Sequence, residues 1–406
     1  AIRMLLYKLQ SLVCAISGKR REKMKIGFDN DIYLQKQAKH IEERIEQFGG
    51  KLYLEFGGKL FDDYHAARVL PGFAPDSKIR MLIQLKDQAE VVIAINANDI
   101  EKNKVRGDLG ITYDEDVIRL RSEFMECGFY VGSVVITHYN GQPSAETFRS
   151  RLRNMGIKTY IHYLIDGYPH DVQFIASDNG FGQNDFIETE RPLVVVTAPG
   201  PGSGKMAVCL SQLYNENKRG VRAGYAKFET FPVWNLPLKH PVNIAYEAAT
   251  ADLNDVNMID PFHYDAYGQV ATNYNRDIEI FPVLNALFQS IYGENPYKSP
   301  TDMGVNMLGF CISDDKVCSQ ASCEEIIRRY YEATNKQADG ADNQSEINKI
   351  KVLFTQANIN TDSRKTTVAA KKRKMECGHT SAAIISIPFL LQSSLSIWAI
   401  SAFIFP

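Results

Sequence analysis

Short apolar runs alternate with longer amphipathic stretches in the first half of the chain, and this alternation constrains the fold more than any other feature. The apolar runs have the length and residue types of buried strands, and they span residues 51–56, 91–95, 130–136, 159–162 and 193–197. Stretches with helical periodicity lie between them, at 31–48, 76–88, 114–127 and 144–155. Strands joined by helices at this spacing run parallel with right-handed crossovers. The sequence therefore predicts an α/β fold built of layered parallel-sheet domains.

The length of 406 residues exceeds a typical single domain and predicts several of them. We expect an amino-terminal α/β domain at 24–185 and a phosphate-loop-like α/β domain at 186–300. The polar, glycine-containing segment 177–191 marks the boundary between the two. A mostly helical extension follows at 301–370, with helices expected at 322–331 and 343–354.

Both ends of the chain differ from its middle. Residues 1–23 do not begin with Met, and we expect them to be a non-native leader before a start at Met24, the alternative being a flexible basic extension. At the other end, a divergent tail at 371–406 has a basic cluster and then an uncharged apolar run at 382–406. This order fits a membrane anchor. The abrupt change after Ala370 also fits a shifted reading frame, and we therefore expect no native anchor.

Charge and cysteine content exclude several classes of protein. The 46 basic and 48 acidic residues leave a net charge of −2, which gives no global attraction to nucleic acid. The seven cysteines are scattered singly, form no disulfide framework and fit a reducing cytoplasm. Neither His-Glu-x-x-His nor Gly-x-Ser-x-Gly occurs, which disfavours a zinc protease and a serine hydrolase. We expect a cytoplasmic protein with a small-molecule partner, and a homo-oligomer stays open.

The segment 193–210 carries the sharpest chemical signal. A buried strand runs into a loop with three glycines and a lysine, and an apolar helix follows. In this context backbone N–H groups turn toward a phosphate and the lysine reaches its oxygens. The match to a Walker motif is incomplete, because Pro199 replaces its first glycine and Met206 replaces the hydroxyl residue that binds magnesium. A structural turn is the alternative. We expect the ligand, ATP or another phosphorylated compound, to bind Gly200, Gly202, Ser203, Gly204 and Lys205.

Charged residues downstream of this loop are further candidates. Lys227 and Glu229 share one face of an extended chain, so they would either position a substrate or form an ion pair. Arg276 would hold a phosphate or a carboxylate, unless it pairs with Asp277 or Glu279. We expect the catalytic roles to fall on Lys205, Lys227, Glu229 and His65.

Magnesium beside a phosphate requires carboxylate oxygens. Asp252, Asp255 and Asp260 supply them in one acidic segment, and Asp260 would end a strand as the acid of a Walker B motif does. A solvated acidic loop is the alternative.

The amino-terminal half has its own set of polar side chains. Side chains at the carboxyl ends of adjacent parallel strands converge, so a second group would share a pocket. This group consists of Glu55, His65, Arg68, Asn96, Asn98 and Arg106. His65 would act there as a general base, the alternative being a capping or packing residue.

Residues 24 to about 370 resemble a bacterial family of unknown function, the one numbered eighteen forty-six. The resemblance rests on YLEFGGKLFDDYHAARVLPGF, INANDIEKNKVRGDLGITYDEDV, TAPGPGSGKM, GYAKFETFPVWNLP, ATADLNDVNMIDPFH, NYNRDIEIFPVLN, SPTDMGVNMLGF and EIIRRYY. It implies a cytosolic α/β protein with a phosphate-loop-like motif. Some members are labelled ATP-dependent peptidase or zinc protease, but the residues for proteolysis are missing from this sequence.

Two functions agree with these residues. The first is a magnesium-dependent enzyme that uses ATP to transfer a phosphoryl group or to activate a carboxylate, with Lys205 neutralising the developing charge. The second is a nucleotide- or metabolite-sensing module without catalysis, which the absence of a hydroxyl residue after Lys205 favours.

Overall fold

The computed structural model describes residues 25–107, 109–253, 255–377, 385–386 and 398–399. The leader expected at 1–23 and most of the tail expected at 371–406 lie outside the described residues. Among the helices that are described, none is both long and apolar enough to cross a membrane.

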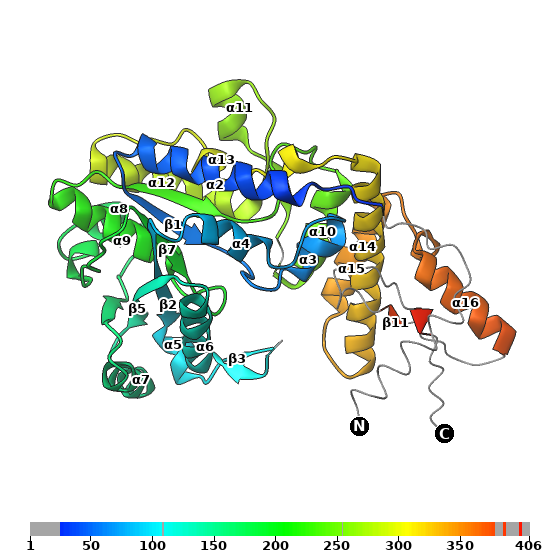
Figure 1. Cartoon of the computed structure of the whole chain (residues 1–406), viewed down its shortest axis with the longest axis horizontal. Helices are drawn as coiled ribbons and strands as arrows, with labels where there is room; N and C mark the ends of the chain where they lie inside the picture. The colour runs from blue at the N-terminus through cyan, green and yellow to red at the C-terminus, as the bar shows by residue number, and fades with distance from the viewer. Residues whose placement is uncertain (1–24, 108, 254, 378–384, 387–397, 400–406) are drawn as a thin grey trace.

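A six-stranded parallel sheet forms the centre of the molecule (Figure 1). From one edge to the other, its strands are β6 (Thr159–Tyr163), β5 (Tyr130–Tyr139), β2 (Ala89–Asn96), β7 (Leu193–Thr197), β1 (Leu52–Phe56) and β8 (Gly224–Phe228). All five residues of each of the strands β1, β7 and β8 are buried, as parallel strands covered on both faces must be. Every apolar run expected to be a strand lies in this sheet, so the α/β class is confirmed.

The sheet corrects one expectation, that of separate α/β units on either side of residue 185. Strand β7 pairs in parallel with both β2 and β1, and β8 pairs with β1. Segments from both sides of the expected boundary therefore share one sheet. Local sequence shows where strands form, but which strands become neighbours depends on pairing between distant segments.

Helices cover both faces of the sheet. The helices expected from periodicity are α2 (Asn30–Gln47), α4 (Ser77–Gln84), α6 (Tyr113–Glu126) and α7 (Pro143–Asn154). Helix α6 contacts β2 and β5, and α7 contacts β5 and β6, whereas α9 (Lys205–Lys218) contacts β1, β7 and β8. Right-handed crossovers toward β6 place α6 and α7 on one face, and the crossover toward β8 places α9 on the other.

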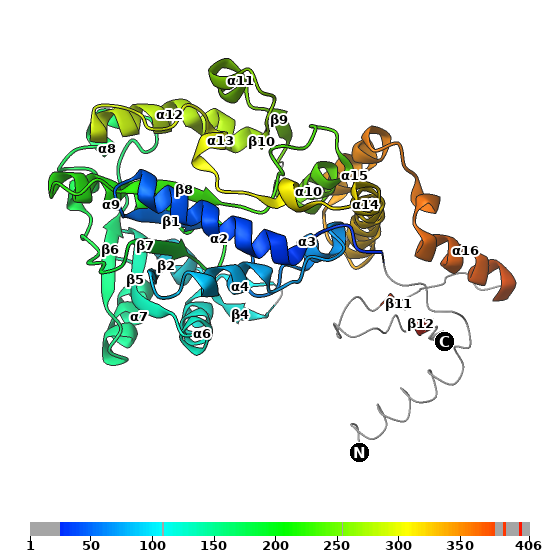
Figure 2. The same cartoon turned by 45° about the horizontal axis from the view of Figure 1, so that its top comes forward.

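A helical region lies to the right of the sheet in Figure 2, on the side that the chain reaches after β1 and β8. Helix α14 (Asp315–Ala338) packs against α10 (Pro241–Ala249), α15 (Gln344–Gln356) and α3 (Tyr64–Val69). Beside it, β9 (Asn257–Ile259) and β10 (Thr272–Tyr274) form an antiparallel ribbon, and α11 (Pro261–Tyr267) projects between them. The other elements are α5 (Ala97–Glu101), β3 (Val105–Arg106), β4 (Ile111–Thr112), α8 (Val172–Ile175), η1 (Phe181–Gln183), η2 (Ala251–Leu253), α12 (Asn275–Tyr292), α13 (Pro300–Met303), η3 (Leu308–Cys311), η4 (Thr361–Ser363), α16 (Lys365–Cys377), β11 (Ile385–Ser386) and β12 (Trp398–Ala399).

The strand order changes direction between β2 and β7. After β2 the chain continues to β5, which lies on one side of this strand pair. After β7 it continues to β8, which lies on the opposite side. Ligands of open α/β sheets bind at the carboxyl ends of the strands where this reversal occurs. The loop that follows β7 is the glycine-rich segment, so the topology places it where a ligand is expected.

Candidate functional site

The loop between β7 and α9 needs glycine for two physical reasons. Gly202 and Gly204 have φ values of +75° and +79°, a conformation that side chains disfavour. Gly200 has no room for a side chain, because a Cβ atom there would lie 2.3 Å from the hydroxyl oxygen of Tyr113. The glycine pattern thus corresponds to a tight loop that joins a central strand to a helix.

Side chains from neighbouring strands hold the loop in place. The Nδ2 atom of Asn96, at the end of β2, donates to the carbonyl oxygen of Gly202 at 3.0 Å. Thr137, on β5, donates through Oγ1 to the carbonyl oxygen of Ser203 at 2.8 Å. The Ser203 hydroxyl in turn donates to the carbonyl oxygen of Gly200. These bonds fix the orientation of the loop peptides relative to the sheet.

Lys205 is the first residue of α9, and its side chain is half-buried. The first N–H groups of a helix have no acceptor within it and give its N-terminus a partial positive charge. Within the described residues, neither the N–H groups of Lys205 and Met206 nor the Lys205 ammonium has a hydrogen-bond or ion-pair partner. This end of α9 therefore combines a positive charge with free donors.

Two residues near the loop, Thr137 and His138, were not predicted from the sequence. Thr137 and His138 lie beside Gly204, since the Cε1 atom of His138 is 3.3 Å from where a Cβ would stand. His138 has a φ of 52°, which is uncommon for a residue with a side chain, and burial lowers its pKa. The sequence feature that could have indicated these two residues is the run of polar residues at 137–140, directly after an apolar run.

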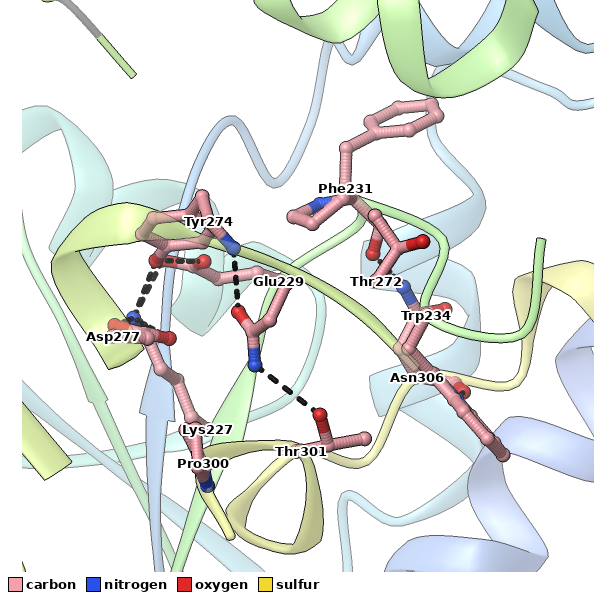
Figure 3. Close-up of a pocket in the computed structure, with 13 residues that line it drawn as sticks. Lys227, Glu229, Phe231, Trp234, Thr272, Tyr274, Asp277, Pro300, Thr301 and Asn306 are labelled. Carbon is pink, nitrogen blue, oxygen red and sulfur yellow. Dashed lines mark hydrogen bonds and ion pairs between the residues drawn. The ribbon is translucent and has the colours of Figure 1, made fainter. Parts of the chain in front are cut away.

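A buried charge cluster lies at the carboxyl end of β8 (Figure 3). The Nζ atom of Lys227 donates to both carboxylate oxygens of Asp277, at 2.6 and 2.8 Å, and to the hydroxyl of Tyr274. Glu229 lies 3.3 Å from the same Nζ atom and accepts a hydrogen bond from Tyr274. Lys227 and Glu229, expected to act together, are in one cluster, while Tyr274 and Asp277 come from distant sequence and were missed.

Burial and charge shift the pKa values of this cluster. Burial raises the pKa of Asp277 to about 6, and the carboxylates of Glu229 and Glu55 add to the shift against the opposing effect of Lys227. Burial disfavours the charged form of Lys227, but Asp277, Glu229 and Glu55 outweigh it and raise the pKa of this lysine. The cluster thus holds more carboxylates than its single ammonium neutralises.

Glu55 on β1 connects the loop with the cluster. It is paired in register with Lys227, so both side chains point to the same face of the sheet, and it accepts a hydrogen bond of 2.6 Å from Tyr225. Burial raises the pKa of Cys209 on α9, and Glu55 raises it further while Lys205 lowers it. Tyr53, two residues before Glu55 on the same strand, donates a hydrogen bond of 2.8 Å to Glu216 of α9. Glu55 and Lys227 therefore lie on the face of the sheet that α9 covers, and the glycine loop leads into this same helix.

The three aspartates expected to bind magnesium have separate environments. The structure corrects the comparison of Asp260 with a Walker B acid: it follows β9, a strand of the small ribbon, and caps α11 through a hydrogen bond from the N–H group of His263. Asp255 is paired with Arg276 at 2.7 Å, and Asp252 is exposed in η2. Across the described residues, no group of three or more His, Cys, Asp or Glu side chains is arranged to hold a metal ion.

His65 lies on α3 and faces α14. Its Nδ1 atom is 3.5 Å from Glu325, and its ring contacts Phe231 edge to face. Glu325 also binds Arg68, Arg328 and Arg329. This is the packing role that stood as the alternative to a general base.

Arg68 shares Glu325 with His65, whereas the other polar residues expected to converge with them have different partners. Arg106 pairs with Asp116 at 3.0 Å, and Asn98 accepts a hydrogen bond of 3.0 Å from Gln142. Asn96 binds the glycine loop and Glu55 the Lys227 cluster, as described above. The six residues expected in one pocket lie in several separate places, because crossover helices between the strands carry these side chains apart.

Replacing His65 with Asn will reduce stability by about 1–2 kcal/mol near pH 7.5, because contacts with Phe231 and Glu325 are lost. Burial lowers the pKa of His65, with Arg329 adding to the shift and Glu325 and Asp63 opposing it. A lowered folded-state pKa means that stability falls as pH drops below the ordinary value of 6.5. Urea unfolding between pH 5 and 7.5 will show a shallower dependence in the variant. An unchanged pH profile would contradict this role.

The fold and the site define an α/β protein with a polar site at the carboxyl edge of a parallel sheet. The chain belongs to the family described as "Domain of unknown function DUF1846, N-terminal", which it matches over residues 26–358. It is 58% identical over 360 residues to "UPF0371 protein" of Streptococcus thermophilus (strain ATCC BAA-491 / LMD-9) and 59% identical over 360 residues to "UPF0371 protein" of Streptococcus sanguinis (strain SK36). Each alignment covers 89% of this chain and 73% of the relative. The family named from the sequence motifs is confirmed over residues 26–358.

Proposed function

We propose that this protein binds a nucleotide or another phosphorylated small molecule at the loop Gly200–Lys205. One observation carries the proposal: a lysine that has no partner among the described residues begins the helix that follows a glycine loop at the reversal of strand order. A cation at a helix N-terminus is unfavourable by itself, and a bound anion removes the conflict. Phosphate supplies both the charge and the acceptor oxygens that this arrangement lacks.

Magnesium is not part of this proposal. Asp255 and Asp260 are engaged by Arg276 and by the start of α11, and neither lies in the six-stranded sheet. Binding through Lys205 and backbone donors requires no metal ligand from the protein.

A thermal-shift screen of the full chain tests the proposal. The compounds are inorganic phosphate, nucleoside mono-, di- and triphosphates and sugar phosphates, each with and without magnesium. A ligand present at a hundredfold excess over its Kd stabilises the folded state by about 2.7 kcal/mol, which raises the melting temperature measurably. The absence of a shift with every phosphorylated compound would overturn the proposal.

A second candidate function is an enzyme that transfers a phosphoryl group or activates a carboxylate. The Lys227 cluster lies on the face of the sheet covered by α9, the helix into which the loop leads, and this arrangement favours an enzyme over a purely sensing module. Turnover of any nucleotide that binds in the screen, measured with a panel of small carboxylates and alcohols, distinguishes the two. Binding without turnover would favour the sensing module over the enzyme.

A further inference from the structure

A small cavity lies beside the Lys227 cluster, at the carboxyl end of β8. Segments 227–234, 272–277 and 300–306 line it. Its volume of about 50 Å³ is sufficient for a small polar group. Figure 3 shows the charged side chains of Lys227 and Asp277 on one side and Trp234 and Phe231 on the other. The cavity therefore has one charged wall and one aromatic wall.

The charged wall has an excess of negative charge. The ammonium of Lys227 faces the carboxylates of Asp277 and Glu229, and Glu55 on the next strand is close enough to act on both. Arg276 does not compensate them, because it is paired with Asp255 at 2.7 Å. Uncompensated charge in a half-buried place is unfavourable, and a cation from a ligand relieves it.

Glu229 is the carboxylate that a ligand can reach. Its side chain is 30% exposed, whereas those of Lys227 and Asp277 are 10% and 11% exposed. A carboxylate offers about four acceptor positions, and Tyr274 and Lys227 use two of those on Glu229. The remaining positions fit donors of an ammonium group, which has three N–H bonds to place.

We propose that this cavity binds the ammonium group of a phosphorylated amine whose phosphate lies on the loop Gly200–Lys205. The phosphate half of this inference rests on the proposed function, and the amine half rests on the cavity. Strands β7 and β8 are separated by β1, so their ends are about 10 Å apart. A small ligand with a phosphate at one end and an amine at the other spans this distance along a single face of the sheet.

A matched pair of probes tests the amine half. Glucosamine 6-phosphate and glucose 6-phosphate differ in an ammonium and a hydroxyl group, and their affinities for the full chain are measured by calorimetry. We expect glucosamine 6-phosphate to bind about tenfold more tightly or better, as a charge-assisted hydrogen bond provides. Glu229→Gln should abolish this preference and leave the affinity for glucose 6-phosphate within about twofold. Glu279→Gln, at an exposed position of α12, is the control and should change neither affinity.

The outcomes separate the two halves of the inference. Equal affinities for the two sugars overturn the ammonium site, and the loop still stands if Lys205→Ala weakens both compounds. A Glu229→Gln protein that loses both ligands equally also overturns it, because the carboxylate is then not specific for the amine. If neither sugar phosphate binds, the amine inference is overturned. The thermal-shift screen with nucleotides then tests the loop on its own.

Discussion

Replacing Lys205 with Ala will weaken the binding of a phosphorylated ligand about tenfold to a hundredfold without destabilising the empty protein. The loss corresponds to one charge-assisted hydrogen bond, about 1.5–3 kcal/mol. Stability should be unchanged or slightly higher, because the lysine has no partner among the described residues and its charge opposes the partial charge at the start of α9. Calorimetric titration and thermal unfolding of both proteins measure the two effects.

Lys218→Ala provides a matched control for this experiment. Lys218 is in the last turn of the same helix, where a positive charge is favourable, and it pairs with Asp178. Its removal should lower stability by up to about 1 kcal/mol and leave ligand affinity unchanged. A Lys205→Ala protein that unfolds more easily and binds as wild type would identify the loop as a structural turn.

Replacing Lys227 with Met will destabilise the protein by about 3–5 kcal/mol near pH 8, the usual cost of removing one partner from a buried ion pair. Asp277 is then left buried beside two other carboxylates without its ammonium partner. The pKa of Asp277 is already raised to about 6, and the loss of Lys227 raises it further. A raised folded-state pKa stabilises the protein below the ordinary value of 3.8, and this contribution is lost as pH rises through the folded-state pKa. Urea unfolding should therefore show a smaller penalty at pH 5 than at pH 8.

Two further variants make this result interpretable. The double variant with Lys227→Met and Asp277→Asn removes both charges and should recover part of the lost stability. Lys316→Met, at an exposed position, should change stability by less than about 0.5 kcal/mol. If Lys227→Met costs no more than Lys316→Met, or if its penalty grows at low pH, the account of the buried cluster is wrong.

Much of the local structure follows from the sequence because short-range physics dictates it. The run at 193–197 is apolar and β-branched and becomes β7, and the glycines after it occupy the positive-φ positions of a tight loop. Lys227 and Glu229 could be placed together because side chains two residues apart in an extended chain share a face. These inferences need only the neighbours of each residue along the chain.

The rest of the site depends on contacts between distant segments. Asp277 and Tyr274 reach Lys227 from about 50 positions away, as the hydrogen-bond partners at sequence separations of 50 and 47 show. Histidine is a common general base, but His65 is buried and contacts Glu325 on α14 in a packing role. Asp260 follows an apolar run as expected, but that strand pairs in a small ribbon outside the parallel sheet.

The sequence by itself determined the α/β class, the positions of five of the six parallel strands and of the helices between them, and a glycine loop with a lysine at the start of a helix. These features depend on hydrophobic periodicity and on backbone conformations that residue types impose locally. The tertiary structure alone decided that β7 inserts between β2 and β1, and that one ammonium lies among three carboxylates at the carboxyl end of β8. The physical reason is that strand neighbours and buried charge clusters arise from pairing between segments far apart in sequence, which no local pattern encodes.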